Sequence, residues 1–301
     1  MPIFAAAPPV RVSAPGGFDY VAVDARRGRV YAADAGTHGL LVVNAETGKV
    51  VGTVRVGRMH GLAVNEANGN VYTGDHADAI SEVDPTTMKE IRRVKVGGPV
   101  DAIAYDSGMH RIYADEDDGN RLFVVDSRTF KVVATVQLPG HKPEYLAVDP
   151  KTHDVYQNIA NLSEIVVIDP HSLKIVRTIG TPELRNDHPL QYDPAFDELL
   201  VAGENRRLSV YDSAGRHRWT IGLAGWVDQC NLDPRDHMLA CAGKNITLVK
   251  LAARSAPVVL AQRYVSPGFH SLAIDPKTGD IWGVWSAPNG SFIQHFAYRA
   301  K

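Results

Sequence analysis

The chain has 301 residues, of which 45% are hydrophobic and 22% are charged, a composition typical of a globular protein with a sizeable core. Its 32 basic and 34 acidic residues leave a formal charge of -2, which argues against nucleic-acid binding because phosphate recognition needs a basic face. No apolar run approaches the ~20 residues that a helix needs to cross a bilayer, so we expect no membrane span.

The start of the chain gives little information on compartment. Residues 1–9 lack a basic segment and are too short to form a signal peptide. They fit a native cytoplasmic start, and they fit equally a mature exported chain with an added Met.

Strand-like segments then follow one another in a regular order. The first repeat predicts strands at 20–24, 29–33, 40–44 and 49–57, since runs rich in Val, Tyr and Leu alternate there with Gly-containing turns. The closing residue of the first segment recurs at spacings of 41, 41, 43, 44, 40 and 42: Asp24, Asn65, Asp106, Asp149, Asp193, Asp233 and Asp275. A period in the forties with four strands per repeat is typical of propeller blades.

The last repeats complete the prediction. The sixth is the most degenerate, with outer strands expected at 246–251 and 258–262. The seventh has strands near 271–275, 280–285 and 291–298, after which the chain ends. Residues 9–13 resemble the fourth strand of the first repeat and supply the missing strand, which removes an exposed edge. We therefore predict an all-β fold, a single seven-bladed β-propeller domain of four-stranded antiparallel blades that begin near residues 19, 60, 101, 144, 188, 228 and 270.

Several segments also resemble a known family. Residues 145–156, 165–170 and 271–282 are similar to the repeats of YVTN/YncE-like seven-bladed β-propellers, although the nearest match to the naming tetrapeptide is Val71-Tyr72-Thr73-Gly74. The resemblance extends over essentially the whole chain. It implies the fold strongly and the function weakly, because members of such folds differ in function, and it slightly favours a periplasmic or secreted mature protein over a cytoplasmic one.

One column of ionisable residues stands out in this alignment of repeats. Each member lies five positions before the closing residue of the first strand, and the members are Asp19, His60, Asp101, Glu144, His188, Asp228 and His270. In a propeller these positions start the innermost strands, so we expect the side chains to ring the mouth of the central channel. With only 34 acidic residues and 12 histidines in 301, chance rarely fills all seven positions.

The column predicts a metal site. Crowded acids and histidines repel or desolvate one another unless a cation is present. His60, His188 and His270 fall in blades two, five and seven, nearly threefold around the ring, and three imidazoles bind Zn, Cu, Fe or Ni with an open coordination position. Asp19, Asp101, Glu144 and Asp228 would orient these rings or act as a general base. A solvated polar ring and a metal-free acid/base site are the alternatives.

Further residues are expected near the same face. The loops between second and third strands offer His76, the best auxiliary ligand because its blade already carries His60, and also a run of acids at 115–118. An apolar rim for an organic ligand is a second role for aromatic side chains that otherwise pack between blades: Trp226, Trp285, Phe269 and Tyr145.

The functional prediction is a metal-dependent enzyme acting on a small organic molecule at the channel mouth. Hydrolysis of a lactone or ester by a metal-bound water is the first hypothesis, and a Cu- or Fe-dependent oxidoreductase is the alternative at the same site. A propeller that binds a ligand or a protein partner without catalysis, with a structural metal, is the alternative of another class. No nucleophile elbow, phosphate loop or His-Glu-x-x-His motif is present.

The two cysteines, Cys230 and Cys241, are too few for a disulfide framework. They are expected on consecutive strands, opposite each other. Two buried thiols packed as small apolar residues are the favoured interpretation, with a disulfide as the alternative.

Overall fold

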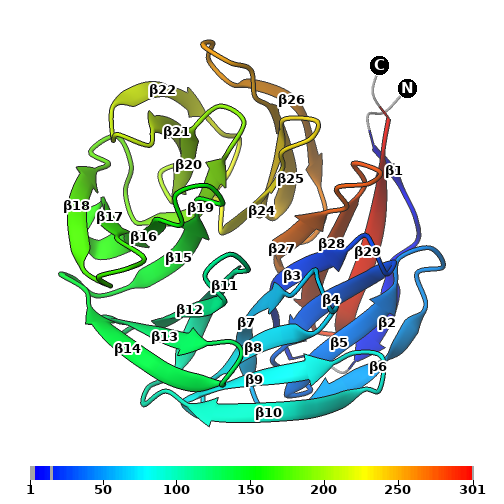
Figure 1. The fold of residues 1–301 in the computed structure, drawn as a ribbon. Helices are drawn as coiled ribbons and strands as arrows, with labels where there is room; N and C mark the ends of the chain where they lie inside the picture. The colour runs from blue at the N-terminus through cyan, green and yellow to red at the C-terminus, as the bar shows by residue number, and fades with distance from the viewer. Residues whose placement is uncertain (1–3, 14–15, 300–301) are drawn as a thin grey trace.

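A computed structural model describes residues 4–13 and 16–299, so the first three residues of the chain start discussed above lie outside it. Seven antiparallel sheets form a closed ring around a central channel, and the first strand of each blade faces the centre (Figure 1). The prediction of a seven-bladed, all-β propeller is confirmed. Within the described ranges no helix is long and apolar enough to cross a membrane.

The strands of the first four blades agree closely with the predicted repeats. Blade one contains β3 (Phe18–Asp24), β4 (Arg29–Asp34), β5 (Gly39–Asn44) and β6 (Val50–Arg55). Blade two contains β7 (Met59–Val64), β8 (Val71–Asp75), β9 (Ala79–Asp84) and β10 (Lys89–Lys95). Blade three contains β11 (Val100–Asp106), β12 (Arg111–Glu116), β13 (Arg121–Asp126) and β14 (Lys131–Gln137). Blade four contains β15 (Pro143–Val148), β16 (Val155–Ile159), the 3-10 turn η1 (Ala160–Leu162), β17 (Glu164–Ile168) and β18 (Ile175–Gly180).

The last three blades follow the same order, including the degenerate sixth repeat. Blade five contains β19 (Asp187–Asp193), β20 (Glu198–Gly203), β21 (Arg207–Asp212) and β22 (His217–Gly222). Blade six contains β23 (Gln229–Asp233), β24 (Met238–Gly243), β25 (Asn245–Lys250) and β26 (Val258–Tyr264). Blade seven contains β27 (Phe269–Ile274), β28 (Ile281–Ala287) and β29 (Gly290–Tyr298), joined by β1 (Phe4–Ala6) and β2 (Val10–Ser13).

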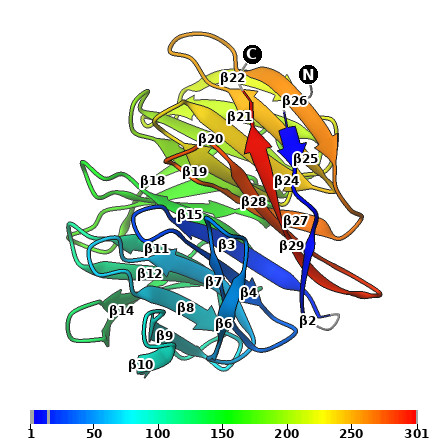
Figure 2. The ribbon, with the colours of Figure 1, turned by 90° about the vertical axis from the view of Figure 1, so that its right-hand side faces the viewer.

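The N-terminal segment closes the ring, as predicted, and does so with two strands. Both β1 and β2 pair antiparallel with β29, so that Val10 lies opposite Ile293 and Phe4 opposite Tyr298 (Figure 2). The pairing of β1 was not predicted. Its physical reason is Phe4, which is buried in the core of blades six and seven together with Phe296.

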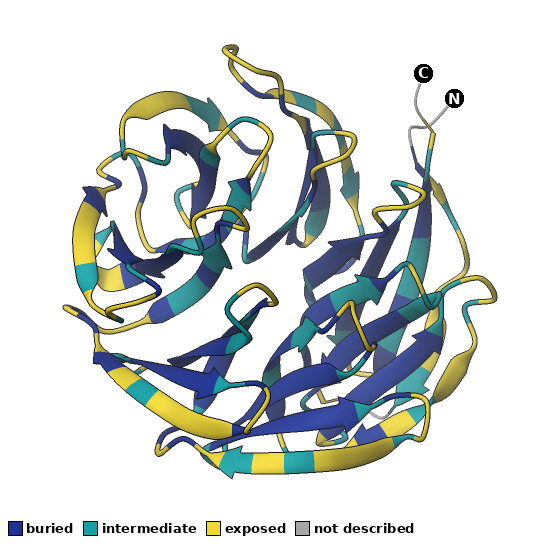
Figure 3. Cartoon of the chain, viewed as in Figure 1, coloured by how far each residue is buried: buried dark blue, intermediate teal, exposed yellow. Residues whose placement is uncertain are grey.

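Burial differs between the strands of a blade. Second and third strands are mostly buried, whereas the fourth strands consist mainly of exposed and partly exposed residues (Figure 3). Large side chains of the second strands, among them Tyr31, Tyr72 and Tyr113, are fully buried between blades. Packing between neighbouring sheets therefore builds the core and fixes the strand ends that carry the ring residues.

The cysteines form a disulfide between β23 and β24, where Cys230 and Cys241 are directly opposite partners. The favoured prediction of two free thiols was therefore wrong, and the alternative applies. The opposition of the two strands, which the sequence predicted, brings the sulfur atoms together, and both residues are buried at 3% and 0% exposure.

Candidate functional site at the channel mouth

The ring residues lie in β-bulges. In six of the blades the pairing of the first and second strands shifts register across the ring residue, as between Phe18 and Val21 or between Met59 and Leu62. In blade six, Asp228 precedes β23 and donates its amide hydrogen to the carbonyl oxygen of Ala242. A bulge re-aims a side chain and is common beside active sites. It allows an ionisable side chain at the start of an otherwise apolar strand to reach the channel.

Two tyrosines from opposite sides of the ring contact each other. Tyr20 and Tyr145 each follow a ring residue, and their ring centroids lie 5.3 Å apart. The hydroxyl of Tyr20 donates a 2.9 Å hydrogen bond to the backbone oxygen of Glu144, joining blade one to blade four across the channel. These two packed side chains, here called the channel floor, therefore connect blades one and four next to the ring residues.

The first group of ring residues, here called the His60 cluster, consists of Asp19, His60, Asp101 and the loop residues His76 and Asp117. The Nδ1 atom of His60 lies 2.8 Å from a carboxylate oxygen of Asp19 and 3.5 Å from one of Asp101. The imidazole of His76 contacts that of His60 edge to face, with centroids 4.3 Å apart. The Nε2 atom of His76 lies 3.4 Å from a carboxylate oxygen of Asp117.

These contacts shift the titration of the cluster. Burial alone would lower the pKa of His60, but hydrogen bonds to Asp101 and Asp19 outweigh it and raise the pKa to about 10. Burial and the nearby charge of His60 lower the pKa of His76. Burial raises the pKa of Asp101 to about 7, against the opposing effect of His60. In the metal-free protein near neutral pH, the imidazole of His60 is therefore protonated, and its Nδ1–H faces the carboxylates of both Asp19 and Asp101.

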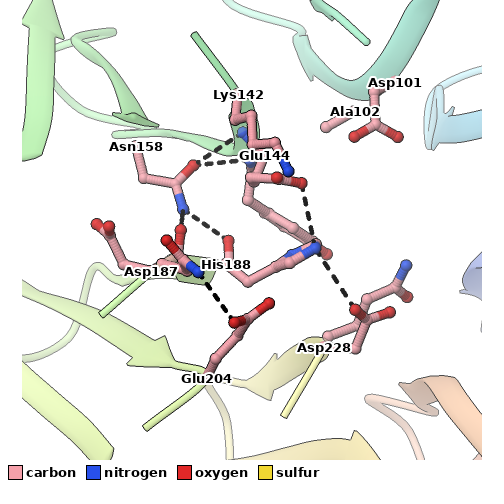
Figure 4. A network of polar contacts seen from close by, with 12 residues as sticks. Asp101, Ala102, Lys142, Glu144, Asn158, Asp187, His188, Glu204 and Asp228 are labelled. Atoms are coloured by element: carbon pink, nitrogen blue, oxygen red, sulfur yellow. Dashed lines mark hydrogen bonds and ion pairs between the residues drawn. The ribbon is translucent and has the colours of Figure 1, made fainter. Parts of the chain in front are cut away.

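The second group, here called the His188 cluster, consists of Glu144, His188, Asp228 and His270. The Nε2 atom of His188 lies 3.1 Å from Glu144 and 3.4 Å from Asp228 (Figure 4). The other oxygen of Asp228 lies 2.9 Å from Nδ1 of His270. Burial, followed by the charge of Asp101, raises the pKa of Glu144 to about 8. Four acid–base groups from blades four to seven thus form one continuous chain.

The backbone of this second cluster is held by a buried amide. Asn158, 0% exposed, accepts hydrogen bonds from the backbone N–H groups of Glu144 and Tyr145 at 3.3 and 2.7 Å. It donates to the backbone oxygens of Asp187 and His188 at 2.7 and 2.6 Å (Figure 4). Asn158 thus lies in β16 and joins blade four to blade five.

The structure groups the predicted ligands differently from the sequence analysis. Among the described residues, the sets of three or more His, Cys or acidic side chains whose ligand atoms lie within 4.8 Å of one another are His60, His76, Asp117 and Asp19, His60, Asp101. Neither set contains a second ring histidine. The predicted auxiliary residue His76 thus lies beside His60, whereas His188 and His270 contact Asp228 on the other side.

The predicted aromatic rim divides into exposed and packed residues. Phe269 is fully buried and contacts Trp285 and Phe296, and Trp285 stacks on Phe292 and is 7% exposed. Phe269 and Trp285 therefore belong to the core of blade seven, because their strands turn these side chains between sheets. Trp226, 37% exposed, remains available at the surface.

Two contacts in the site were not anticipated from the sequence. Gln229 donates a 2.9 Å hydrogen bond to Asp19, linking blade six to blade one, and Tyr20 spans the channel. Both residues directly follow a ring residue. The position directly after the column was therefore the signal.

A well-formed cavity lies away from the channel mouth. A cavity of about 560 Å³ opens on the opposite face, between the turns of blades five and six, and its lining includes Phe196, Arg218 and Trp219. Arg218 there is already paired with Asp212. The convergence of unpaired polar atoms, rather than the volume of a cavity, therefore identifies the channel mouth as the candidate site.

Comparisons with known proteins support the fold. Hydrazine synthase of Kuenenia stuttgartiensis superimposes with a TM-score of 0.79 at 17% identity, over 94% of this chain and 96% of the other. The β-propeller domain of Cps50 (Swd1) from Myceliophteria thermophila superimposes with a TM-score of 0.78 at 12% identity, over 98% and 100%. No family model matches the chain. No curated protein matches it either. At these identities the likeness defines the class of protein, a seven-bladed β-propeller, and carries no activity across.

Proposed function

We propose that the protein is a metal-dependent enzyme that acts on a small organic molecule at the channel mouth. The observation that carries the proposal is the pairing of every ring histidine with a ring carboxylate from an adjoining blade, at 2.8 to 3.1 Å for the nearest contact of each. Carboxylate–imidazole pairs orient metal ligands and general bases. A solvated polar ring does not require such pairing at each histidine.

Hydrolysis of a lactone or ester is the reaction we favour. A bound transition metal would supply a water of lowered pKa and a Lewis acid for the carbonyl. Glu144 is the residue best placed to hold a proton near neutral pH, because burial raises its pKa to about 8. Asp228 would keep His188 and His270 in fixed orientations, since its two oxygens contact both rings.

The metal and the reaction are tested together. The full chain, purified without added metal, is analysed for Zn, Cu, Fe and Ni and then assayed against a panel of esters and lactones before and after chelation. We expect a near-stoichiometric metal and an activity that chelation abolishes and re-addition restores. Glu144→Gln should lower kcat at least about 100-fold, whereas Glu204→Gln, an exposed neighbour, should not. Activity that survives complete removal of metal would refute the proposal.

The other readings of the site have their own outcomes in this assay. Oxygen consumption or substrate oxidation with bound Cu or Fe would indicate the oxidoreductase. A tightly held metal with turnover of no substrate would favour a ligand- or protein-binding propeller. Membership of the YVTN/YncE-like family remains a proposal supported by the repeats. The Cys230–Cys241 disulfide supports a periplasmic or secreted location, because disulfides persist in oxidising compartments.

A further inference from the structure

The geometry points to His60, His76 and Asp117 as the metal ligands, in place of the three ring histidines. This inference rests on the proposed function and specifies its metal site. Each of the three side chains offers one ligand atom, and these atoms lie within 4.8 Å of one another. His60 comes from the bulge of β7, His76 from the loop after β8, and Asp117 from the loop after β12.

Unpartnered nitrogens support this set. Within the described part of the chain, the Nε2 atoms of His60 and His76 are both buried and make no hydrogen bond, and the contact of the second with Asp117, at 3.4 Å, is an ion pair without hydrogen-bond geometry. Buried polar atoms in native proteins are almost always satisfied, and two such imidazole nitrogens next to a carboxylate have the composition of a transition-metal site.

The second nitrogen of His60 is already fixed. Its Nδ1 lies against Asp19 and Asp101, which directs Nε2 toward His76. A metal-bound histidine commonly gives its other ring nitrogen to a carboxylate in this way, and the partner sets the tautomer and ring orientation. Asp19 and Asp101 are thus positioning residues for the site.

The loops that carry the other two ligands are also fixed. The backbone N–H of His76 donates to the backbone oxygen of Arg58, and that of Asp117 donates to the backbone oxygen of Pro99, each at 3.0 Å. Asp75 accepts the backbone N–H groups of Ala77 and Ala79 and pairs with Arg93. The ligands therefore lie on preorganised backbone, which precise metal geometry requires.

The His188 cluster offers no comparable set of ligand atoms. Nδ1 of His188 is also buried without a hydrogen-bond partner, but among the described residues no set of three ligand atoms within 4.8 Å of one another includes His188. The Nε2 of His188 lies between two carboxylates, and Nδ1 of His270 contacts Asp228 and the hydroxyl of Ser271.

The ligand types at the proposed site indicate the metal. The set of His60, His76 and Asp117 combines two imidazoles and one carboxylate. Such a set binds catalytic zinc and non-haem Fe(II), with positions left open for water or substrate. We assign the site to Zn²⁺ or Fe²⁺, and Ca²⁺ is disfavoured because two of the three ligands are nitrogen.

Metal titration of the chelated full chain tests the assignment. Zn²⁺ affinity is measured by competition with a chromophoric chelator, and Co²⁺ absorption reports coordination. His76→Ala and Asp117→Ala should each weaken Zn²⁺ binding at least about 100-fold, and Asp19→Asn or Asp101→Asn about 10-fold with an altered Co²⁺ spectrum. The His188→Ala/His270→Ala double variant and the exposed control His141→Ala should bind within about 3-fold of the parent chain, and circular dichroism checks that every variant is folded.

The outcomes separate this inference from the proposed function. Unchanged affinity in His76→Ala and Asp117→Ala, with loss in the His188/His270 variant, overturns the ligand assignment and leaves a metal-dependent enzyme with ring-histidine ligands. Absence of Zn²⁺, Co²⁺ and Fe²⁺ binding by the parent chain overturns both. Loss only in the variants of His76 and Asp117, with no chelator-sensitive turnover, supports the ligands and refutes the enzyme.

Discussion

The His60 cluster and the His188 cluster start from the same strand position and use it differently. In both, a bulged or strand-entry residue brings an imidazole between acids of adjoining blades. In the first cluster the carboxylates contact Nδ1 of His60, while its Nε2 makes no hydrogen bond and its ring packs against a second imidazole. In the second cluster the carboxylates contact Nε2 of His188, while its Nδ1 is buried without a hydrogen-bond partner.

The difference comes from residues at or beyond the ends of the second strands. The loop after β8 contributes His76, whose ring turns toward His60. In blade four, Asn158 lies within β16, and its amide satisfies four backbone groups and is not free to bind a ligand. His76 therefore adds an imidazole to the ring, whereas Asn158 stabilises the contact between blades. The ring alone therefore does not decide where an ion binds.

The largest expected effect concerns Asn158 in β16. Asn158→Ala should lower the free energy of unfolding by about 3–4 kcal/mol, because it leaves two donors and two acceptors of the buried backbone unsatisfied, each at a cost of about 1–3 kcal/mol before relaxation. Urea denaturation measures the change, with the exposed Asn161→Ala as control. Zn²⁺ affinity should stay unchanged. A cost below about 1 kcal/mol would contradict the role of Asn158 as a clip between blades.

The disulfide gives the next effect, also on the side of the His188 cluster. Reduction of Cys230–Cys241, whose sequence separation is 11, should lower the free energy of unfolding by about 2–3 kcal/mol through the entropy of the unfolded chain. Denaturation with and without reductant measures it. Cys230 lies two residues after Asp228, so reduction should disturb this cluster more than the His60 cluster. Two titratable thiols in the unreduced, denatured protein would show that the bridge is absent.

The pH dependence of stability separates the clusters further. The folded-state pKa of Glu144 is raised to about 8 from 4.5, so its stabilising contribution is full below pH 4.5 and is lost as pH rises through 8. For His60, raised from 6.5 to about 10, the loss runs from pH 6.5 through 10. In metal-free protein, Glu144→Gln should flatten the decline between pH 5 and 8 by about 1–2 kcal/mol. An identical slope in the variant would contradict burial of this carboxyl.

Much of this arrangement was predictable from the sequence, and the limits have physical causes. The repeat spacing fixes the blades, and the column fixes which side chains reach the channel mouth, because both depend on local periodicity. Which nitrogen of each histidine faces an acid depends on rotamers and bulge geometry, which a one-dimensional pattern does not contain. The pairing of His60 with His76 was anticipated as an auxiliary contact, but the role of Asn158 depends on the backbone of the next blade.

The smallest expected effect tests the link between the clusters through the channel floor. Tyr20→Phe removes the hydrogen bond to the backbone oxygen of Glu144 and should cost about 1 kcal/mol, the usual net value for a neutral hydrogen bond. The exposed Tyr264→Phe, at 61% exposure, serves as control. Tyr20 and Asn158 hold the peptide group between Glu144 and Tyr145, since its carbonyl accepts from Tyr20 and its N–H donates to Asn158. A double-mutant cycle between Tyr20→Phe and Asn158→Ala should therefore give a coupling energy of at least about 0.5 kcal/mol. Additivity of the two variants would mean that the floor and the clip act independently, and that the two clusters do not communicate through Glu144.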